Sequence, residues 1–416
     1  MVGPRGVDES WTKPLKKFED RVLKWASLGK GMQLGALTYN TFAMSTLLYV
    51  AQLMRVPDKA IELERSMVTK MFPGPGHWIE PEDLWFMHEA YGTCKSVQSL
   101  SIVARSAKLR IATLGCHFDS KWIGPNQLRR VGQDNIFERA FLFKRTMAQS
   151  DHIDRIVFYN KWYQNNLCCN LVSNIKELKA QGINATDIIT NIVECPIRDI
   201  GDKGMQKLKT TFQSQVSKAI KSYEAPCPVE RIRYKLSRWQ GTPWGISGLQ
   251  RNNNVRAHRH ICHLAKLVPP RIHAAVLHTL FNGWETHRRM QTRKALTNLC
   301  VFKCNPTAED SLEHYCRCSV VQRIALRTFK IEYVPEQALN LWSLSSNGLD
   351  NDSHLISIAI LQYGVYSAFN TLRSSPVNDS QQAYHCILQH CRQGVFGHPK
   401  CMKHFDSRWT ESIQYI

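Results

Sequence analysis

The sequence predicts a mainly α, multi-helical protein. Apolar residues recur at helical spacing through most of the chain, alternating strand patterns are scarce, and Gly and Pro separate the segments. With 43% hydrophobic and 21% charged residues, the 416-residue chain has an ordinary globular composition, which excludes a disordered or fibrous protein. Its length suggests about two to four domains.

The first predicted helix covers about residues 11–28. One stripe of it carries the apolar residues Leu15, Phe18, Val22 and Trp25. Lys and Arg occupy the other faces, so the stripe is expected to pack into a core.

The ends of this helix are marked by local residues. Asp8 or Ser10 is predicted to cap its start, and Gly29 and Gly31 to end it. A second helix is predicted in residues 34–54, LGALTYNTFAMSTLLYVAQLM. It is apolar on most sides, and we therefore expect it to be central.

Near the C-terminus, one strong helix is predicted at about residues 353–373. Its apolar stretch, residues 355–369, is broken by Gln362 and Gly364. The stretch is also shorter than the roughly 20 apolar residues that a membrane-spanning helix needs. No signal peptide is recognisable at the N-terminus, so we predict a soluble intracellular protein of the nucleus or cytoplasm.

Five consecutive parts are predicted along the chain. They are a helical segment (1–78), a helical linker domain (79–225), a basic helical region (226–299), a metal-binding knuckle (300–318) and a C-terminal helical segment with a tail (319–416).

The charge of the chain is strongly positive and unevenly distributed. The net charge is +20, and residues 231–294 hold thirteen Lys and Arg against one acid, Glu285. A solvated helix face normally mixes both signs, so this excess favours a polyanionic partner. We predict RNA or DNA rather than a membrane surface.

The candidate nucleic-acid contacts combine cations with aromatic rings, which pair with phosphates and stack on bases. They are Arg231, Arg233, Tyr234, Lys235, Arg238, Trp239, Arg256, Arg259, Arg271, Arg288, Arg289, Arg293 and Lys294.

A cysteine-rich segment follows the basic region, LCVFKCNPTAEDSLEHYCRC. Three thiolates and one imidazole suit a tetrahedral zinc ion, and four protein ligands would make the site structural. The predicted ligands are Cys300, Cys304, His314 and Cys318. Cys316 is a rival for the fourth position, although a single residue between it and His314 would strain chelation. The Cys and His residues of 386–404 fit no zinc pattern.

No catalytic residue is predicted. The chain lacks a P-loop, a G-x-G-x-x-G fingerprint and a G-x-S-x-G elbow. It also contains no two adjacent aspartates, whereas a polymerase palm usually binds its metals through such a pair.

Three stretches resemble the C-terminal part of a LINE-type (non-LTR) retrotransposon reverse transcriptase. Residues 11–53 are similar to the segment after the palm, residues 268–291 to the basic helices before the zinc motif, and the Cys-Cys-His-Cys cluster to that motif, with its acidic approach at 309–314. The resemblance implies a thumb that grips a template–primer duplex, a basic linker and a zinc knuckle. The His-x3-Cys spacing is one residue shorter than is usual in the family, and the fingers, the palm and the Asp-Asp motif are missing.

From these observations we predict a non-catalytic fragment that binds nucleic acid through basic helices and a structural zinc knuckle. Two alternatives remain open. The chain is part of an active RNA-directed DNA polymerase whose palm is encoded upstream, or it is a host helical scaffold protein that binds an acidic partner.

Overall fold

The computed structural model confirms the mainly α prediction. It describes residues 7–107, 225–239, 249–290 and 299–413, apart from residues 30, 55, 77, 105 and 333, together with the single residues 217 and 221. Within these residues the only extended pairing is one isolated bridge, between Leu299 and Glu309. The predicted linker domain lies largely outside the described residues.

The chain divides into two compact units. The first comprises Met1–Leu28, Leu37–Met71 and Val97–Glu224, and the second comprises Gly29–Ala36, Phe72–Ser96 and Ala225–Ile416. The parts predicted as a basic region, a knuckle and a C-terminal segment therefore lie in one unit.

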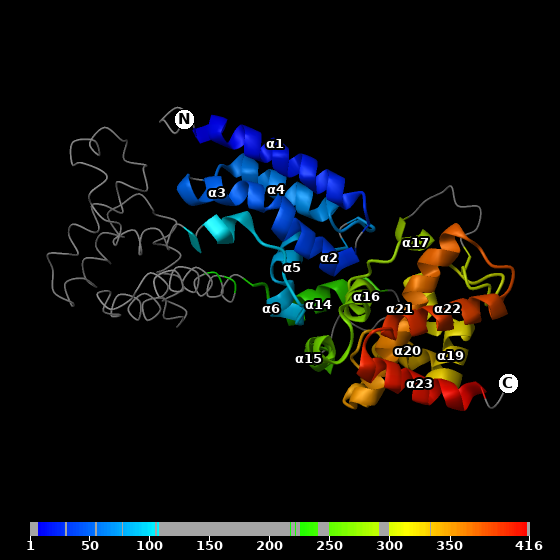
Figure 1. Ribbon diagram of the computed structural model, residues 1–416. Helices are drawn as coiled ribbons and strands as arrows, with labels where there is room; N and C mark the ends of the chain where they lie inside the picture. The colour runs from blue at the N-terminus through cyan, green and yellow to red at the C-terminus, as the bar shows by residue number, and fades with distance from the viewer. Residues whose placement is uncertain are drawn as a thin grey trace, which may run out of the picture. The chain divides into compact units, whose positions relative to one another are not determined.

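The first unit packs α1 (Val7–Ala26) against α3 (Ser45–Leu53) and α4 (Asp58–Lys70), which lie side by side in Figure 1. The predicted stripe of α1 is confirmed. Leu15, Phe18 and Val22 are buried, and Trp25 stacks on Phe42 at 5.1 Å between ring centroids.

The predicted start of α1 is wrong. The helix begins at Val7, so Asp8 and Ser10 lie inside its first turns rather than at its cap. The predicted end is close, because Gly29 and Gly31 both adopt left-handed backbone angles after Ala26.

The second apolar segment forms two α-helices joined by a π-helical turn instead of one helix. α2 (Gly31–Thr38) continues into η1 (Tyr39–Ala43), where the Met44 amide donates to the Tyr39 carbonyl at 2.9 Å, before α3 begins. The wider turn holds two polar contacts that a regular helix would aim elsewhere. Asn40 accepts a hydrogen bond from the Gln98 amide, and Tyr39 donates to Glu64 at 3.4 Å.

Glu64 is the buried polar centre of the first unit. Its Oε1 also accepts a hydrogen bond from the Leu100 amide at 2.7 Å. Burial raises the pKa of Glu64 to about 8, although that amide bond opposes the shift.

The second unit contains the remaining helices of the described chain (Figure 1). They are α5 (Pro81–Trp85), α6 (Met87–Tyr91), α14 (Pro228–Leu236), α15 (Leu249–Leu267), α16 (Pro270–Leu280), α17 (His287–Met290), α18 (Leu312–Arg317), α19 (Ser319–Phe329), α20 (Pro335–Trp342), η5 (Asn347–Leu349), α21 (Asp352–Ser374), α22 (Ser380–Val395) and α23 (Pro399–Ile413).

The helix predicted at residues 353–373 is confirmed as α21, the central helix of this unit, which packs against α16, α19 and α22. By length and composition it could cross a membrane. However, 67% of its apolar window is buried inside the protein, as in the core helix of a soluble domain.

Gln362 and Gly364, which interrupt the apolar stretch of the sequence, are both buried within the continuous helix. The side chain of Gln362 donates to the Trp342 carbonyl at 3.0 Å. Gly364 faces Cys391 of α22, and a Cβ atom at this position would clash with its sulfur. These residues therefore provide helix contacts rather than helix breaks.

Candidate metal centre

Cys300 and Cys304 lie on a tight turn that follows the isolated bridge. The Cys300 amide donates to the Ala308 carbonyl at 2.8 Å, and the Lys303 amide donates back to the Cys300 carbonyl at 3.1 Å. Lys303 has a left-handed backbone with φ of 53°, which reverses the chain so that both thiols are on the same side of the turn.

His314 and Cys318 come from α18 and its C-terminal end. Ser311 caps this helix, and its side chain accepts a hydrogen bond from the His314 amide at 3.2 Å. Cys318 is the junction residue between α18 and α19. One short helix thus presents the imidazole from its middle and the third thiol from its end.

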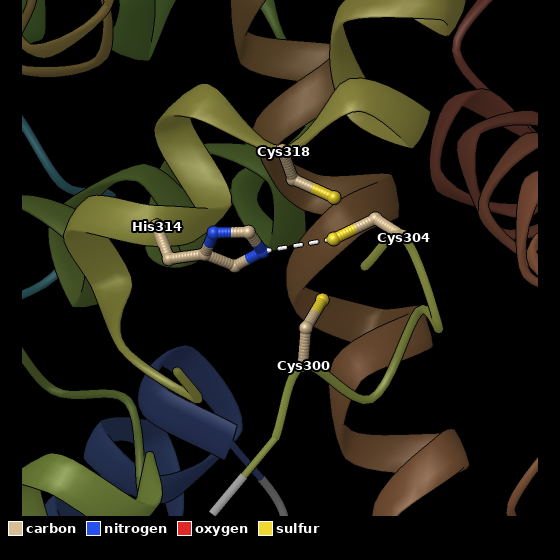
Figure 2. A group of neighbouring side chains, drawn as sticks. All are labelled: Cys300, Cys304, His314 and Cys318. Carbon is tan, nitrogen blue, oxygen red and sulfur yellow. Dashed lines mark hydrogen bonds between the residues drawn. The ribbon is translucent and has the colours of Figure 1, made fainter. Parts of the chain in front are cut away.

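The four predicted ligands converge on one point. Figure 2 shows the three sulfurs and the imidazole ring directed toward one another, and their ligand atoms all lie within 4.8 Å of each other. The Cys304 sulfur is 3.2 Å from Nε2 of His314. In a tetrahedral zinc site, metal–sulfur bonds of about 2.3 Å place two sulfurs about 3.8 Å apart, so this cluster could hold a metal ion with little adjustment.

The choice between Cys316 and Cys318 is settled by position. Cys318 belongs to the cluster, whereas Cys316 is fully buried elsewhere, and this burial raises its pKa well above the ordinary value. The thiols at 386–404 do not gather into such a group in the described part of the chain. Cys391 donates to the Ile360 carbonyl and Cys401 to the Leu267 carbonyl.

The three thiols form hydrogen bonds with one another. Hydrogen bonds from Cys300 and Cys318 lower the pKa of Cys304, while the bond to Cys304 raises the pKa of Cys300. Sulfurs packed this closely cannot all carry a negative charge unless a cation lies between them, and this is the chemistry of a thiolate metal site.

The cluster is built on the core of the second unit. Phe302, which lies between the first two cysteines, and Tyr315, which follows the histidine, pack with ring centroids 5.0 Å apart. Tyr315 also contacts Trp284 and Phe369, the latter on α21. The cluster is therefore anchored by buried aromatic rings on both of its chain segments.

Two acids before α18 connect the cluster to α17. Asp310 accepts hydrogen bonds from the Tyr315 hydroxyl at 2.6 Å and from the His287 amide at 2.7 Å. Its backbone carbonyl accepts from the Arg288 amide, and Glu309 forms an ion pair with the Arg288 side chain at 3.2 Å. The knuckle thus fixes the start of the helix that carries Arg288 and Arg289.

Two predicted nucleic-acid contacts are wrong. Lys235 and Trp239 are 1% and 2% exposed, and the Lys235 ammonium donates to the Trp78 carbonyl at 2.7 Å. Burial lowers the pKa of Lys235 to about 8. Lys235 lies on the buried stripe of α14 with Ile232 and Leu236, and Trp239 follows the end of the helix. The three- and four-residue spacing of these four residues could have been read from the sequence.

Several predicted contacts bind other parts of the second unit. Arg231 forms a double hydrogen bond to Asp83 at 2.7 and 2.6 Å. Arg259 pairs with Asp350, and Arg256 donates to the Ser345 carbonyl at 3.0 Å.

Arg271 is used in the same way, since it donates to the carbonyls of Gly394 and Phe396. Asp83 and Asp350, which pair with Arg231 and Arg259, lie 148 and 91 residues away along the chain, so a charge count over the basic tract does not include them.

A smaller group stays at the surface. Arg233 is exposed and pairs with Glu230 at 3.0 Å on the same helix. Tyr234 is 45% exposed, and the Arg238 guanidinium lies 4.8 Å from its ring centroid. Arg289 donates to the Gly76 carbonyl at 2.9 Å. Arg293 and Lys294 lie outside the described residues.

Comparison with protein families, with curated proteins and with solved structures finds no match to this chain.

Proposed function

We propose that this chain binds the backbone of RNA or DNA without performing chemistry, as the non-catalytic part of a LINE-type reverse transcriptase. The observation that carries the proposal is the Cys3His cluster, whose neighbouring acids hold a helix bearing arginines. A net charge of +20 favours a polyanionic partner, because cations that neutralise phosphates release condensed counterions.

Zinc is the ion that we propose for the cluster. Three thiolates and one imidazole form a soft, four-coordinate ligand set, which suits zinc and does not suit calcium or magnesium. When bound, the ion would cross-link the turn at Cys300 to α18. Four protein ligands leave no open position for a water molecule, so the role is structural.

The function is tested by measuring the affinity of the full chain for labelled RNA and DNA oligonucleotides between 50 and 200 mM salt. We expect binding that depends little on sequence and weakens linearly on a log–log plot, with a slope of about −0.7 to −0.9 per contacted phosphate. Affinity that does not change with salt would contradict the proposal.

Two controls separate the alternatives. Primer extension with Mg²⁺ and nucleotides that yields product would identify a polymerase instead of a binding fragment. Salt-insensitive capture of a purified protein partner, with no nucleic acid present, would favour a scaffold. Zinc bound at one equivalent per chain, and absent from a Cys304→Ser variant, would support the metal assignment.

A further inference from the structure

Among the described residues, Arg238 and Arg289 lack the carboxylate partner that the neighbouring arginines of α14 and α17 have. Arg238 follows the last turn of α14, and Arg289 lies in α17. In the part of the chain that the structure describes, neither has a carboxylate within ion-pair distance, whereas Arg231, Arg233 and Arg288 each have one.

Arg238 contacts the Tyr234 side chain directly, and Arg289 interacts electrostatically with both of these residues. Arg238 donates to the Tyr234 hydroxyl at 2.6 Å and lies over its ring. Burial and then the positive charge of Arg238 lower the pKa of Arg289, while Tyr234 opposes that shift. Like charges repel each other, and an anion bound by both guanidinium groups would relieve the repulsion.

Not all of the hydrogen-bond donors of Arg289 have an acceptor among the described residues. One of its terminal nitrogens donates to the Gly76 carbonyl at 2.9 Å. Its Nε atom is buried and has no hydrogen-bond partner among the described residues. A buried, charged donor without an acceptor is costly, so this group is suited to an acceptor supplied by a ligand.

We propose that Arg238, Arg289 and Tyr234 form a binding site for one phosphate group of an RNA or DNA strand. The assignment rests on the proposed nucleic-acid function and limits it to three of the thirteen predicted contacts. Guanidinium forks match the oxygens of a phosphodiester with paired hydrogen bonds, and two forks can bind one phosphate from both sides. The exposed part of the Tyr234 ring would border the sugar or base of the bound nucleotide.

The matched control lies one helical turn away. Arg233 has the same charge as Arg238, lies on α14 just before it and is exposed, but its guanidinium is paired with Glu230. Replacing Arg233 removes one positive charge from this surface and leaves the proposed site intact.

The test compares the double variant Arg238→Gln/Arg289→Gln with Arg233→Gln in the full chain, using a labelled 20-nucleotide RNA. We expect the double variant to bind about 10- to 100-fold more weakly and to reduce the salt slope by about one, with little change for Arg233→Gln. An Arg238→Lys/Arg289→Lys variant keeps both positive charges but lacks the paired guanidinium donors. It should therefore bind more tightly than the glutamine variant and more weakly than the wild type. Equal losses in Arg233→Gln and the double variant would overturn the site while leaving the proposed function standing.

A second measurement separates the site from the function. Inorganic phosphate is titrated into the ¹⁵N-arginine-labelled chain, and the Nε–Hε resonances are followed by NMR. Saturable shifts of two arginine signals that are lost in the double variant would support the site even if RNA did not bind. No saturable shift with phosphate would overturn it, and a site that bound anionic lipid vesicles but not RNA would do so as well.

Discussion

Two groups of cations in the same basic tract have different partners. On α15, Arg256, Arg259, His260 and His263 all point to acceptors in residues 344–352, namely two backbone carbonyls and the carboxylates of Asp350 and Asp352. Arg238, which follows α14, and Arg289, on α17, have no acidic partner among the described residues. Net charge counted along a sequence therefore overestimates the charge available to a ligand, because the neutralising acids come from distant segments.

His260 illustrates how fully the α15 group is used. It is only 3% exposed, and its Nδ1 lies 2.7 Å from the Leu344 carbonyl while its Nε2 lies 3.1 Å from Asp350. Both partners are acceptors, so the ring joins α15 to the segment before α21 from both of its nitrogens. Such residues stabilise the fold, and few of their hydrogen-bonding atoms remain available to a ligand.

Metal removal should reduce stability more than any other change considered. It should also affect Arg289, because Glu309 and Asp310 connect the metal-binding cluster to α17. Chelation, or Cys318→Ser, should destabilise the second unit by up to about 10 kcal/mol and loosen α17. Thermal unfolding followed by circular dichroism measures this. The control is Cys316→Ser, which lies outside the cluster and should cost only about 1–2 kcal/mol. Equal losses in both variants would contradict a metal role.

The Asp83→Ala substitution should have the next largest effect. The Asp83 carboxylate is 1% exposed and binds Arg231 through both oxygens, and it also accepts the Glu80 amide at the start of α5. Its removal should lower the free energy of unfolding by about 3 kcal/mol, since it leaves the Arg231 guanidinium with only the 4.0 Å ion pair to Glu80. Urea denaturation measures the loss. By contrast, Arg238→Gln should change stability by less than about 0.5 kcal/mol.

The contribution of Asp350, a partner of the α15 group, should depend on pH. The hydrogen bond from His260 lowers the pKa of Asp350, so the unfolded chain binds this proton more readily than the folded one. The stabilisation is therefore present above the ordinary aspartate pKa of about 3.9 and is lost as the pH falls through the lower folded value. Urea unfolding of wild type and Asp350→Asn should differ at pH 5 and converge near pH 2.5. A constant difference would contradict this role.

The smallest effect is expected for Arg259→Gln. The pair with Asp350 is 64% and 57% exposed, and exposed ion pairs contribute about 0–1 kcal/mol. Affinity for RNA should not change, because this guanidinium already has a partner. An affinity loss as large as that of Arg238→Gln/Arg289→Gln would remove the distinction between the two groups.

Local patterns predicted much of the fold and the ligand set of the cluster. Periodicity predicted α1 and α21, and residue type with spacing predicted Cys300, Cys304, His314 and Cys318. What could not be predicted depends on contacts between distant segments. The π-helical turn holds Tyr39 and Asn40 toward Glu64 and Gln98, and the tract's acids are far away in sequence.

The close approach of α21 and α22 has a consequence for the whole second unit. Gly364 lies against Cys391, and Gly394 lies against Tyr363, so each helix presents a glycine where the other presents a side chain. Neither position has room for even one methyl group, and an alanine there would wedge the hairpin apart. Because α21 also carries Phe369, whose ring packs against Tyr315 at 5.4 Å between centroids, displacement of α21 would be transmitted to the helix that carries His314.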